Sequence, residues 1–335
     1  MVRDKAMAGS GREMGKRPEA NEVRRIACIG CGVIGAGWAA HFLARGYDVV
    51  GWDPGVYAEA GLRTAVEAAW PILTDLGLAP GASLSRLTFT PTLGQACGGA
   101  EFVQESAPER LSLKQELLAE IDKATPAGVV IASSTSGFLM SEMQGQALHP
   151  ERLVVGHPFN PPYLMPLVEV VGGEDTDAAA VDWAAAFYEA AGKTVIRMKR
   201  EVPGFIADRL QQAIWHEALY MIEAGEATVS EIDRAIAAGP GLRWAIMGHC
   251  LTFHLAGGED GMARFLDHFD PEVAAPWTRL ASPDLTPELR QAVIDGSEAA
   301  SGGLSVAELT QHRDRCLVAI MRALEKARGT DGAIP

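Results

Sequence analysis

The sequence predicts an α/β fold, a doubly wound sheet followed by an all-helical C-terminal domain, and three observations lead to this prediction. Short apolar segments alternate with helical segments from Val23 to about residue 198. A glycine-rich turn joins the first apolar segment to the first helical one, and the alternation stops near Lys199 to Pro203. Strands that alternate with helices are typical of a mostly parallel sheet covered by helices on both faces.

The elements of the sheet domain follow from this alternation. The segment VRRIACIG predicts a first strand, and WAAHFLARG after the glycine-rich turn predicts a helix. The second strand, Asp48 to Asp53, follows that helix, so we expect the two strands to be parallel with a right-handed crossover. Later strands are expected in LTFT, AEFVQES, VVIASS, RLVVGHP, PLVEVV and TVIRM. Helices are expected at Tyr57 to Leu76, in LKQELLAEIDK and in DAAAVDWAAAFYEAAG.

Three regions are expected along the chain. Residues 1–22 are polar and of mixed charge, which predicts a disordered tail, and residues 23–200 would form the sheet domain. Residues 201–330 would form the helical domain, beginning with FIADRLQQAIWHEALYMIEAG. Further helices are expected at Val229 to Ala238, Gly261 to Phe269, Pro287 to Ser297 and Val306 to Lys326.

Composition excludes several classes of function. The 335 residues carry 29 Lys and Arg against 43 Asp and Glu, and a net charge of −14 would repel a nucleic acid. No apolar run approaches the roughly 18 residues that span a bilayer. Five cysteines without an apolar signal segment favour a reducing, cytoplasmic compartment. His249 and His254 lack a metal-binding spacing, so no metal is expected.

The turn IGCGVIGAGW carries the pattern G-x-G-x-x-G directly between a strand and a helix. Gly30 allows the tight turn, Gly32 allows the backbone to approach a pyrophosphate, and Gly35 allows the helix to pack closely on the strand. Val33 and Ile34 open the helix, whose free N–H groups attract the anion. The turn therefore predicts a Rossmann-type dinucleotide site.

Asp53 ends the second strand and predicts which dinucleotide is bound. A carboxylate there accepts hydrogen bonds from both hydroxyls of the adenosine ribose, and it would repel the 2′-phosphate of NADP. The nearest following arginine, Arg63, lies well inside the next helix. NAD is therefore the expected cofactor, unless Asp53 only begins an Asp-Pro turn with Pro54.

Three polar residues, Ser136, His157 and Glu169, stand at or in the later strands. Glu169 lies within PLVEVV, where a charged carboxylate is costly to bury unless it is paired, and His157 is a natural partner on the neighbouring strand. We therefore expect a His-Glu pair at the ligand edge of the sheet. The alternatives are a core histidine with satisfied hydrogen bonds and an exposed strand carboxylate.

The motifs IGCGVIGAGW, ASSTSG, GHPFNP, PLVEVV and PGFIADRL, in that order, resemble the 3-hydroxyacyl-CoA dehydrogenase superfamily across nearly all of Val23 to Leu324. The resemblance implies NAD-dependent oxidation of a 3-hydroxyl group by hydride transfer, with His157 as general base and Glu169 orienting it. Ser136 would donate a hydrogen bond to the substrate oxygen. The family also implies a homodimer formed through the helical domain, and cofactor-pocket positions at Glu109, Lys114 and Asn160.

Two departures from the family argue against an acyl-CoA substrate. Asp208 stands where the pattern PGF-x-x-N-R has asparagine, and no lysine occurs between Asp53 and Lys114, where acyl-CoA members carry a lysine-rich hairpin. The segments PGLRWAIMGHCLTFHLAGGEDGMARFLDHF, PWTRL and GGLSVAEL resemble the branch of the family that oxidises L-carnitine to 3-dehydrocarnitine. The alternatives are another small 3-hydroxy acid such as L-gulonate or 3-hydroxybutyrate, a 3-hydroxyacyl-CoA, and a non-catalytic, crystallin-like NAD-binding protein.

A carnitine site must hold a trimethylammonium group, which donates no hydrogen bond. Aromatic faces and negative charge are the groups that bind such a cation. Aromatic residues of a helical domain are commonly core residues, and Asp208 could instead favour the positive end of its helix or pair with Arg209. The candidates for the substrate site are Asp208, Trp244, Phe253 and Trp277.

Overall fold

The protein is described from a computed structural model. The structure describes residues 17–245, 248–256, 265, 286–289, 291 and 306–331. The chain divides into two compact units, residues 1–206 and residues 207–335. This division lies a few residues after the change of pattern at Lys199 to Pro203.

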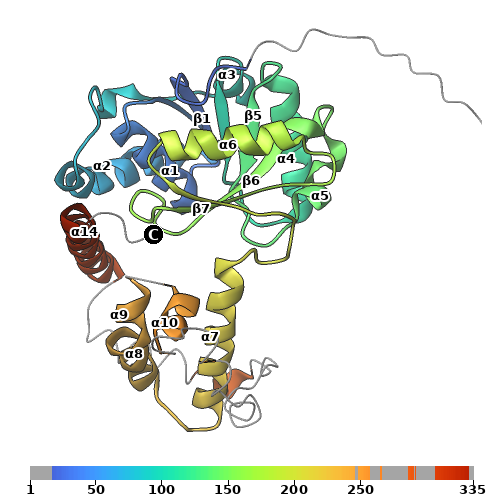
Figure 1. The fold of residues 1–335 in the computed structure, drawn as a ribbon. Helices are drawn as coiled ribbons and strands as arrows, with labels where there is room; N and C mark the ends of the chain where they lie inside the picture. Colours follow the sequence, from blue (N-terminus) through green and yellow to red (C-terminus); the bar gives the residue numbers. More distant parts are fainter. Residues whose placement is uncertain are drawn as a thin grey trace, which may run out of the picture. The chain divides into compact units, whose positions relative to one another are not determined.

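The first unit is built on one eight-stranded sheet, in the order β3-β2-β1-β4-β5-β6-β7-β8 (Figure 1). Each expected strand segment forms a strand, because each is short, apolar and bounded by turn residues. The strands are β1 Arg25–Ile29, β2 Asp48–Trp52, β3 Leu87–Phe89, β4 Phe102–Glu105, β5 Val130–Ser133, β6 Leu153–Pro158, β7 Leu167–Gly172 and β8 Thr194–Arg197.

All neighbouring strands are parallel except β6 and β7, which are antiparallel. The sequence left the direction of β7 open. Residues 159–166 form no helix, and this connection is too short for the crossover that a parallel partner needs. The antiparallel register places His157 directly opposite Glu169.

Helices cover both faces of the sheet, which confirms the predicted fold class (Figure 1). On β1, Ile26 and Cys28 belong to one core cluster, while Ala27 and Ile29 belong to the other, so successive side chains meet opposite layers. One layer holds α1 Val33–Ala44, α2 Ala58–Leu76 and α6 Ala178–Ala190. The other holds α3 Leu93–Cys97, α4 Leu111–Ala124 and α5 Met140–Met143.

Residues 17–206 also contain three single-turn 3₁₀ helices, which lie at Leu84–Arg86, Gln144–Gln146 and Pro150–Arg152. Part of the expected N-terminal tail contacts the first unit. Arg17 donates from Nε to the carbonyl of Gly128 at 2.8 Å, and the indole of Trp183 donates to the carbonyl of Pro18 at 2.8 Å. Residues 1–16 lie outside the described residues.

The described part of the second unit consists of helices joined by turns. Its helices are α7 Ala207–Glu223, α8 Val229–Ala238, α9 Pro240–Trp244, α10 His249–Ala256 and α14 Val306–Asp331. Thr228 and Glu231 form a capping box that starts α8 at the expected residue. The expected helix Gly261–Phe269, apart from Phe265, most of Pro287–Ser297 and the candidate Trp277 lie outside the described residues.

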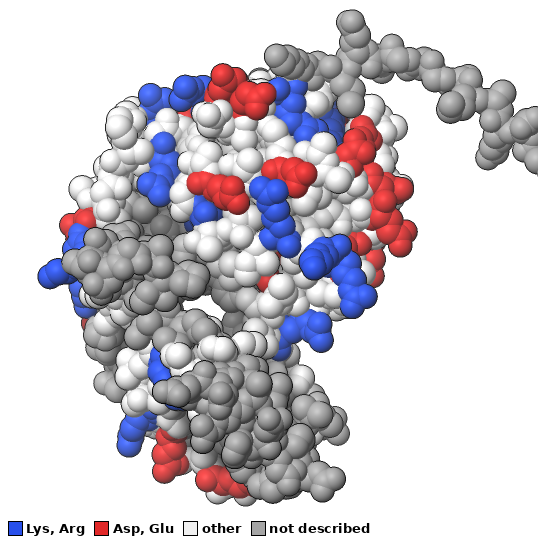
Figure 2. All heavy atoms as spheres, viewed as in Figure 1, with Lys and Arg blue, Asp and Glu red and all other residues white. Residues whose placement is uncertain are grey.

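Surface charge and helix hydropathy add two observations. On the face shown in Figure 2, acidic and basic side chains of the first unit are both spread over the surface, and neither sign forms one large patch. Within the described residues, no helix is both long enough and apolar enough to cross a membrane.

Candidate active site

The glycine-rich turn between β1 and α1 has the geometry that close approach of a ligand requires. Gly30 has a φ of +87°, and a Cβ there would lie 2.7 Å from the carbonyl carbon of Ser106. A Cβ on Gly35 would collide with the carbonyl oxygen of Gly30, whereas one on Gly32 would meet nothing within 4 Å. Helix α1 begins at Val33 with no side-chain cap. Its first N–H groups donate to no side-chain cap, and Val33 and Ile34 line a cavity, so these groups are available to an anion.

Asp53 connects the end of β2 to this turn. Its Oδ2 accepts a hydrogen bond from the backbone N–H of Cys31 at 2.9 Å, and its Oδ1 accepts one from Gly55 at 2.8 Å. The side chain is half-buried, and an ionised carboxylate has about four acceptor positions. Asp53 is thus held in place while it keeps capacity to accept hydrogen bonds from a ribose.

Two neighbouring cavities lie along this edge of the sheet. The first, of about 360 Å³, connects Asp53 to Ser136 and is lined by Gly32, Val33, Ile34, Asp53, Ser106, Ala107, Pro108, Glu109, Ser134 and Ser136. The second, of about 330 Å³, includes Gly30, Trp52, Asp53 and Pro54. Six residues that the sequence assigned to the cofactor or the substrate line the first cavity, and the second cavity, which shares Asp53 with it, adds Gly30. A helix N-terminus and a carboxylate at these positions fit a dinucleotide there.

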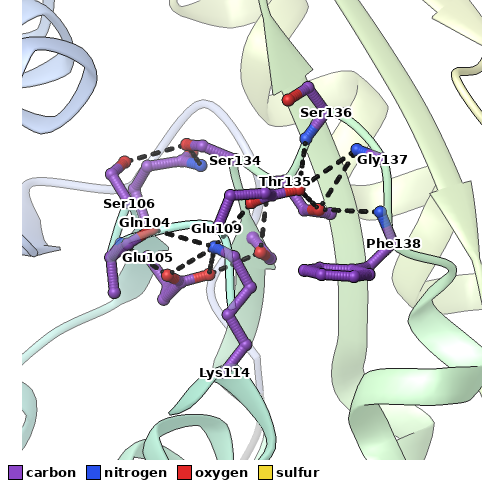
Figure 3. Close-up of polar contacts among 12 residues, drawn as sticks. Gln104, Glu105, Ser106, Glu109, Lys114, Ser134, Thr135, Ser136, Gly137 and Phe138 are labelled. Atoms are coloured by element: carbon purple, nitrogen blue, oxygen red, sulfur yellow. Dashed lines mark hydrogen bonds and ion pairs between the residues drawn. The ribbon is translucent and has the colours of Figure 1, made fainter. Parts of the chain in front are cut away.

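Glu109 holds the loop that carries Ser136 (Figure 3). Its Oε1 accepts hydrogen bonds from the hydroxyl of Thr135, from the N–H of Ser136 at 3.2 Å and from the N–H of Gly137 at 3.1 Å. Ser136 itself is exposed. Glu109 therefore fixes the loop beside the cavity. Nothing in the sequence indicated Thr135 as a partner of Glu109.

Lys114 lies beneath the cavity and is only 1% exposed. Its Nζ contacts the two carboxylate oxygens of Glu105 at 2.9 and 3.2 Å and Glu109 at 3.5 Å. Glu105 is fully buried and also accepts hydrogen bonds from Ser133 and from the N–H of Ala107. Sequence reasoning missed Glu105, although a carboxylate ending the apolar strand AEFVQES was a signal for a buried partner.

His157 and Glu169 form a buried pair across β6 and β7. His157 Nδ1 lies 3.0 Å from Glu169 Oε2, and the second carboxylate oxygen accepts a hydrogen bond from the N–H of Ile206 at 3.0 Å. The rings of Phe159 and Phe205 pack on the imidazole at centroid distances of 5.4 and 5.1 Å. The carboxylate and these rings fix the orientation of the imidazole.

Ser136 and His157 lie at the same edge of the sheet. Strands β5 and β6 are parallel and in register at Ser133 and Val155, so the residues beyond their carboxyl ends are neighbours. Asn160 is exposed just beyond β6. The topology thus gathers the predicted base, the predicted hydroxyl donor and the predicted cofactor-pocket residues along one edge.

Lys193 holds the segment that follows His157, and sequence reasoning missed it. Its Nζ donates to the carbonyls of Pro162 and, at 3.0 Å, Met165, and lies 4.9 Å from the centroid of the Trp38 ring. Burial, with a smaller contribution from Arg45, lowers the pKa of Lys193 to about 7.

The other candidate substrate residues lie in the second unit. Asp208 lies in the first turn of α7 and is half-buried, and it lines a groove formed with apolar residues of α7 and α8, among them Ile214 and Ile232. Trp244 and Phe253 both pack on the ring of His249, at centroid distances of 5.9 and 4.3 Å. The structure thus brings the two aromatic candidates onto one histidine, and Trp277 lies outside the described residues.

Comparison with known families identifies both parts of the chain. Residues 25–202 match the model of the 3-hydroxyacyl-CoA dehydrogenase NAD-binding domain, and residues 204–292 match that of the 3-hydroxyacyl-CoA dehydrogenase C-terminal domain. The chain belongs to the 3-hydroxyacyl-CoA dehydrogenase family. It is an NAD-dependent dehydrogenase, and NAD is its cofactor.

Curated members of the 3-hydroxyacyl-CoA dehydrogenase family resemble this chain over most of its length. A protein named L-carnitine dehydrogenase from Streptomyces coelicolor is 65% identical over 90% of this chain and 95% of its own. Another L-carnitine dehydrogenase, from Pseudomonas aeruginosa, is 51% identical over 93% of this chain and 97% of its own.

Solved structures of dehydrogenases share the fold of this chain. An NAD⁺-dependent dismutase that acts on a 3-hydroxy-2-methylpyridine carboxylic acid aligns with a TM-score of 0.77 and 28% identity, covering 90% of this chain and 99% of its own. The 3-hydroxybutyryl-CoA dehydrogenase of Escherichia coli aligns with a TM-score of 0.63 and 26% identity, covering 82% of this chain and 57% of its own.

Proposed function

We propose that this protein oxidises the 3-hydroxyl group of L-carnitine to 3-dehydrocarnitine with NAD. The observation that carries this proposal is the 65% identity with a named L-carnitine dehydrogenase over 90% of the chain. The half-buried carboxylate of Asp208 and the aromatic pair on His249 support it, because these are the groups that bind a quaternary ammonium. The lysine-free stretch from Asp53 to Lys114 disfavours the phosphates of CoA.

The mechanism assigns one task to each residue at the sheet edge. NAD, when bound, supplies the acceptor for the carbinol hydrogen and its electron pair. With Nδ1 of His157 hydrogen-bonded to Glu169, Nε2 is the atom that takes the hydroxyl proton as the carbonyl forms. Glu169 keeps the ring oriented and stabilises its cationic form. Ser136 donates a hydrogen bond to the reacting oxygen.

Cofactor contacts are part of the same proposal. Gly30, Gly32 and Gly35, with the α1 residues Val33 and Ile34, hold the pyrophosphate, and Asp53 holds the adenosine ribose. Asn160 and Glu109 contact the nicotinamide half of the cofactor. Because Lys114 is buried against Glu105, we propose that it acts on the cofactor pocket through Glu109.

The substrate assignment is tested with a panel of four compounds. Specificity constants are compared for L-carnitine, 3-hydroxybutyrate, L-gulonate and 3-hydroxybutyryl-CoA with NAD at alkaline pH. We expect L-carnitine to have the highest value, and Asp208→Asn to lower it more than the value for 3-hydroxybutyrate. A competitor that exceeds L-carnitine, or an equal loss for both acids in Asp208→Asn, contradicts the proposal.

The remaining parts of the proposal concern the whole protein. We propose that residues 23–200 bind NAD, that residues 201–330 bind substrate, and that the latter also form a homodimer in the cytoplasm. Exposed apolar side chains on α7 support the dimer, among them Leu210, Ile214 and Trp215. Light scattering after size exclusion should give about twice 35.6 kDa, and a monomeric mass at micromolar concentration would refute the dimer.

A further inference from the structure

A chain of hydrogen bonds runs from the interior of the first unit to the cavity beside the glycine-rich turn. The phenol of Tyr188 on α6 contacts Gln104 Oε1 at 2.6 Å, and Gln104 Nε2 lies 2.9 Å from Ser134 Oγ. Ser134 Oγ lies 2.9 Å from Ser106 Oγ and 3.2 Å from the indole nitrogen of Trp38. Figure 3 shows the serine end of this chain. Ser106 and Ser134 both line the cavity that connects Asp53 to Ser136.

Tyr188 sets the direction of the first hydrogen bonds. Its side chain is fully buried, and burial raises the pKa of the phenol, so the hydroxyl keeps its proton. Within the part of the chain that the structure describes, Gln104 Oε1 is the acceptor for that proton. A buried O–H group without an acceptor is costly, so Tyr188 donates and the amide oxygen of Gln104 accepts. The amide nitrogen of Gln104 must then donate to Ser134.

The direction of the hydrogen bond between Ser134 and Ser106 follows from the two lone pairs of a hydroxyl oxygen. Ser134 Oγ receives the indole N–H of Trp38 and the amide N–H of Gln104, which occupy both of them. Ser134 must therefore donate its own proton to Ser106 Oγ. The proton of Ser106 is then directed away from Ser134, towards the cavity.

The position of Ser106 indicates which ligand accepts its hydroxyl proton. Its backbone packs on Gly30, and its Cβ lies 3.4 Å from the position of a Cβ on Gly35. The side chain therefore adjoins the turn that holds the middle of a dinucleotide. The pyrophosphate and both riboses of NAD present oxygen atoms that accept hydrogen bonds. The carboxylate of the substrate presents acceptors of the same kind.

We propose that Ser106 donates its hydroxyl proton to an oxygen of bound NAD, and that the buried Tyr188 sets this direction through two intervening side chains. Ser106 is then a cofactor-binding residue that the glycine fingerprint does not contain. Tyr188, Gln104 and Ser134 are positioning residues, because they act on the cofactor only through Ser106. The inference rests on NAD as the cofactor and does not depend on the identity of the substrate.

The test measures NADH affinity without substrate, from the change in NADH fluorescence on binding. We expect Ser106→Ala to raise the Kd for NADH about threefold to tenfold, the loss of one hydrogen bond. Tyr188→Phe should raise the Kd for NADH by less. Without the phenol, the hydrogen bonds of Gln104, Ser134 and Ser106 can run in either direction, and bound NADH still favours the direction in which Ser106 donates to it. In the Ser106→Ala background, Tyr188→Phe should change the Kd no further.

Matched controls separate this effect from general damage. Tyr47→Phe removes a half-buried phenol that packs on Phe42 and Phe187 in the same unit, and Ser112→Ala removes an exposed hydroxyl on α4. Both should leave the Kd for NADH unchanged. Melting temperatures verify folding, and Ser106→Cys, which keeps the side-chain volume with a weaker donor, replaces Ser106→Ala if that variant does not fold.

Two results would overturn the proposal. An unchanged Kd for NADH in Ser106→Ala, with or without a raised KM for substrate, shows that the proton does not serve the cofactor. Effects of Ser106→Ala and Tyr188→Phe that combine independently show that Tyr188 does not act through Ser106. Failure of L-carnitine in the substrate panel leaves these measurements unaffected, so the two proposals can fail separately.

Discussion

Glu169 lies among valines in β7, and both oxygens of its carboxylate have hydrogen-bond partners. One contacts His157 Nδ1 and the other accepts from the N–H of Ile206. A buried carboxylate is stable only with such partners. The contact with Nδ1 also orients the imidazole, and it leaves Nε2 as the ring nitrogen for the base role that we propose.

Substitutions at this pair should separate catalysis from cofactor binding. His157→Ala should lower kcat by about 100-fold or more, because general base catalysis contributes roughly 100 to 10,000-fold. Glu169→Gln should lower kcat in the same direction, since an amide oxygen orients the ring without a charge to stabilise its cationic form. The Kd for NADH serves as the control and should stay within about twofold. Near-normal turnover by folded His157→Ala would remove this residue from the mechanism.

At the scale of elements, the strand-turn-helix unit β1-α1 uses its glycines for two different purposes. Gly35 is needed by the protein, because a Cβ there would collide with the carbonyl of Gly30. Gly32 has a φ of −68° and open space around it, so the folded chain has no need of a glycine at that position. We propose that the pyrophosphate of NAD approaches the backbone at this position, which accounts for Gly32.

Alanine at each glycine should therefore have a different effect. Gly35→Ala should lower the melting temperature by several degrees, since a backbone collision must be relieved by moving α1 away from β1. Gly32→Ala should leave the melting temperature unchanged and weaken NADH binding by about tenfold or more, because the methyl group occupies the space of the pyrophosphate. Calorimetry and NADH titration measure the two quantities. Equal melting temperatures for Gly35→Ala and the parent, or equal NADH affinity for Gly32→Ala, would contradict this division.

At the scale of the whole molecule, Lys193 links the stability of the protein to pH. Its folded pKa of about 7 lies below its ordinary value of 10.5 because the ammonium is buried. Between these two pH values the unfolded chain binds more protons than the native protein, so the unfolding free energy rises with pH. Below about pH 7 the native protein keeps the buried charge and its full cost.

Comparison with Lys193→Met isolates this contribution from other titrating groups. From pH 7.5 to 9, the unfolding free energy of the parent minus that of the variant should increase by up to about 1.4 kcal/mol per pH unit. The loss of the two hydrogen bonds to carbonyls lowers the stability of the variant by an amount that does not vary with pH. Urea unfolding at several pH values measures the difference, and parallel curves would show that Lys193 titrates normally.

The alternation of strands and helices, the dinucleotide turn and Asp53 could be predicted from sequence because each depends on residues close together in the chain. The turn from Gly30 to Gly35 depends on local backbone geometry, and Asp53 directly follows its own strand. The confirmed α/β fold and NAD cofactor follow from such local signals. The pairing of His157 with Glu169 was also within reach, because a charge inside an apolar strand requires a partner.

Only the tertiary structure decided which distant side chains meet. The connection after β6 makes β7 antiparallel, and that register brings His157 opposite Glu169. Hydrogen bonds from Lys193 to the loop after β6, and from Tyr188 to Gln104, join positions far apart in the chain. No periodicity or local motif encodes these contacts, because they depend on how strands and helices pack. The sequence by itself therefore determined the elements and the cofactor, while packing determined the orientation of the groups that surround the site.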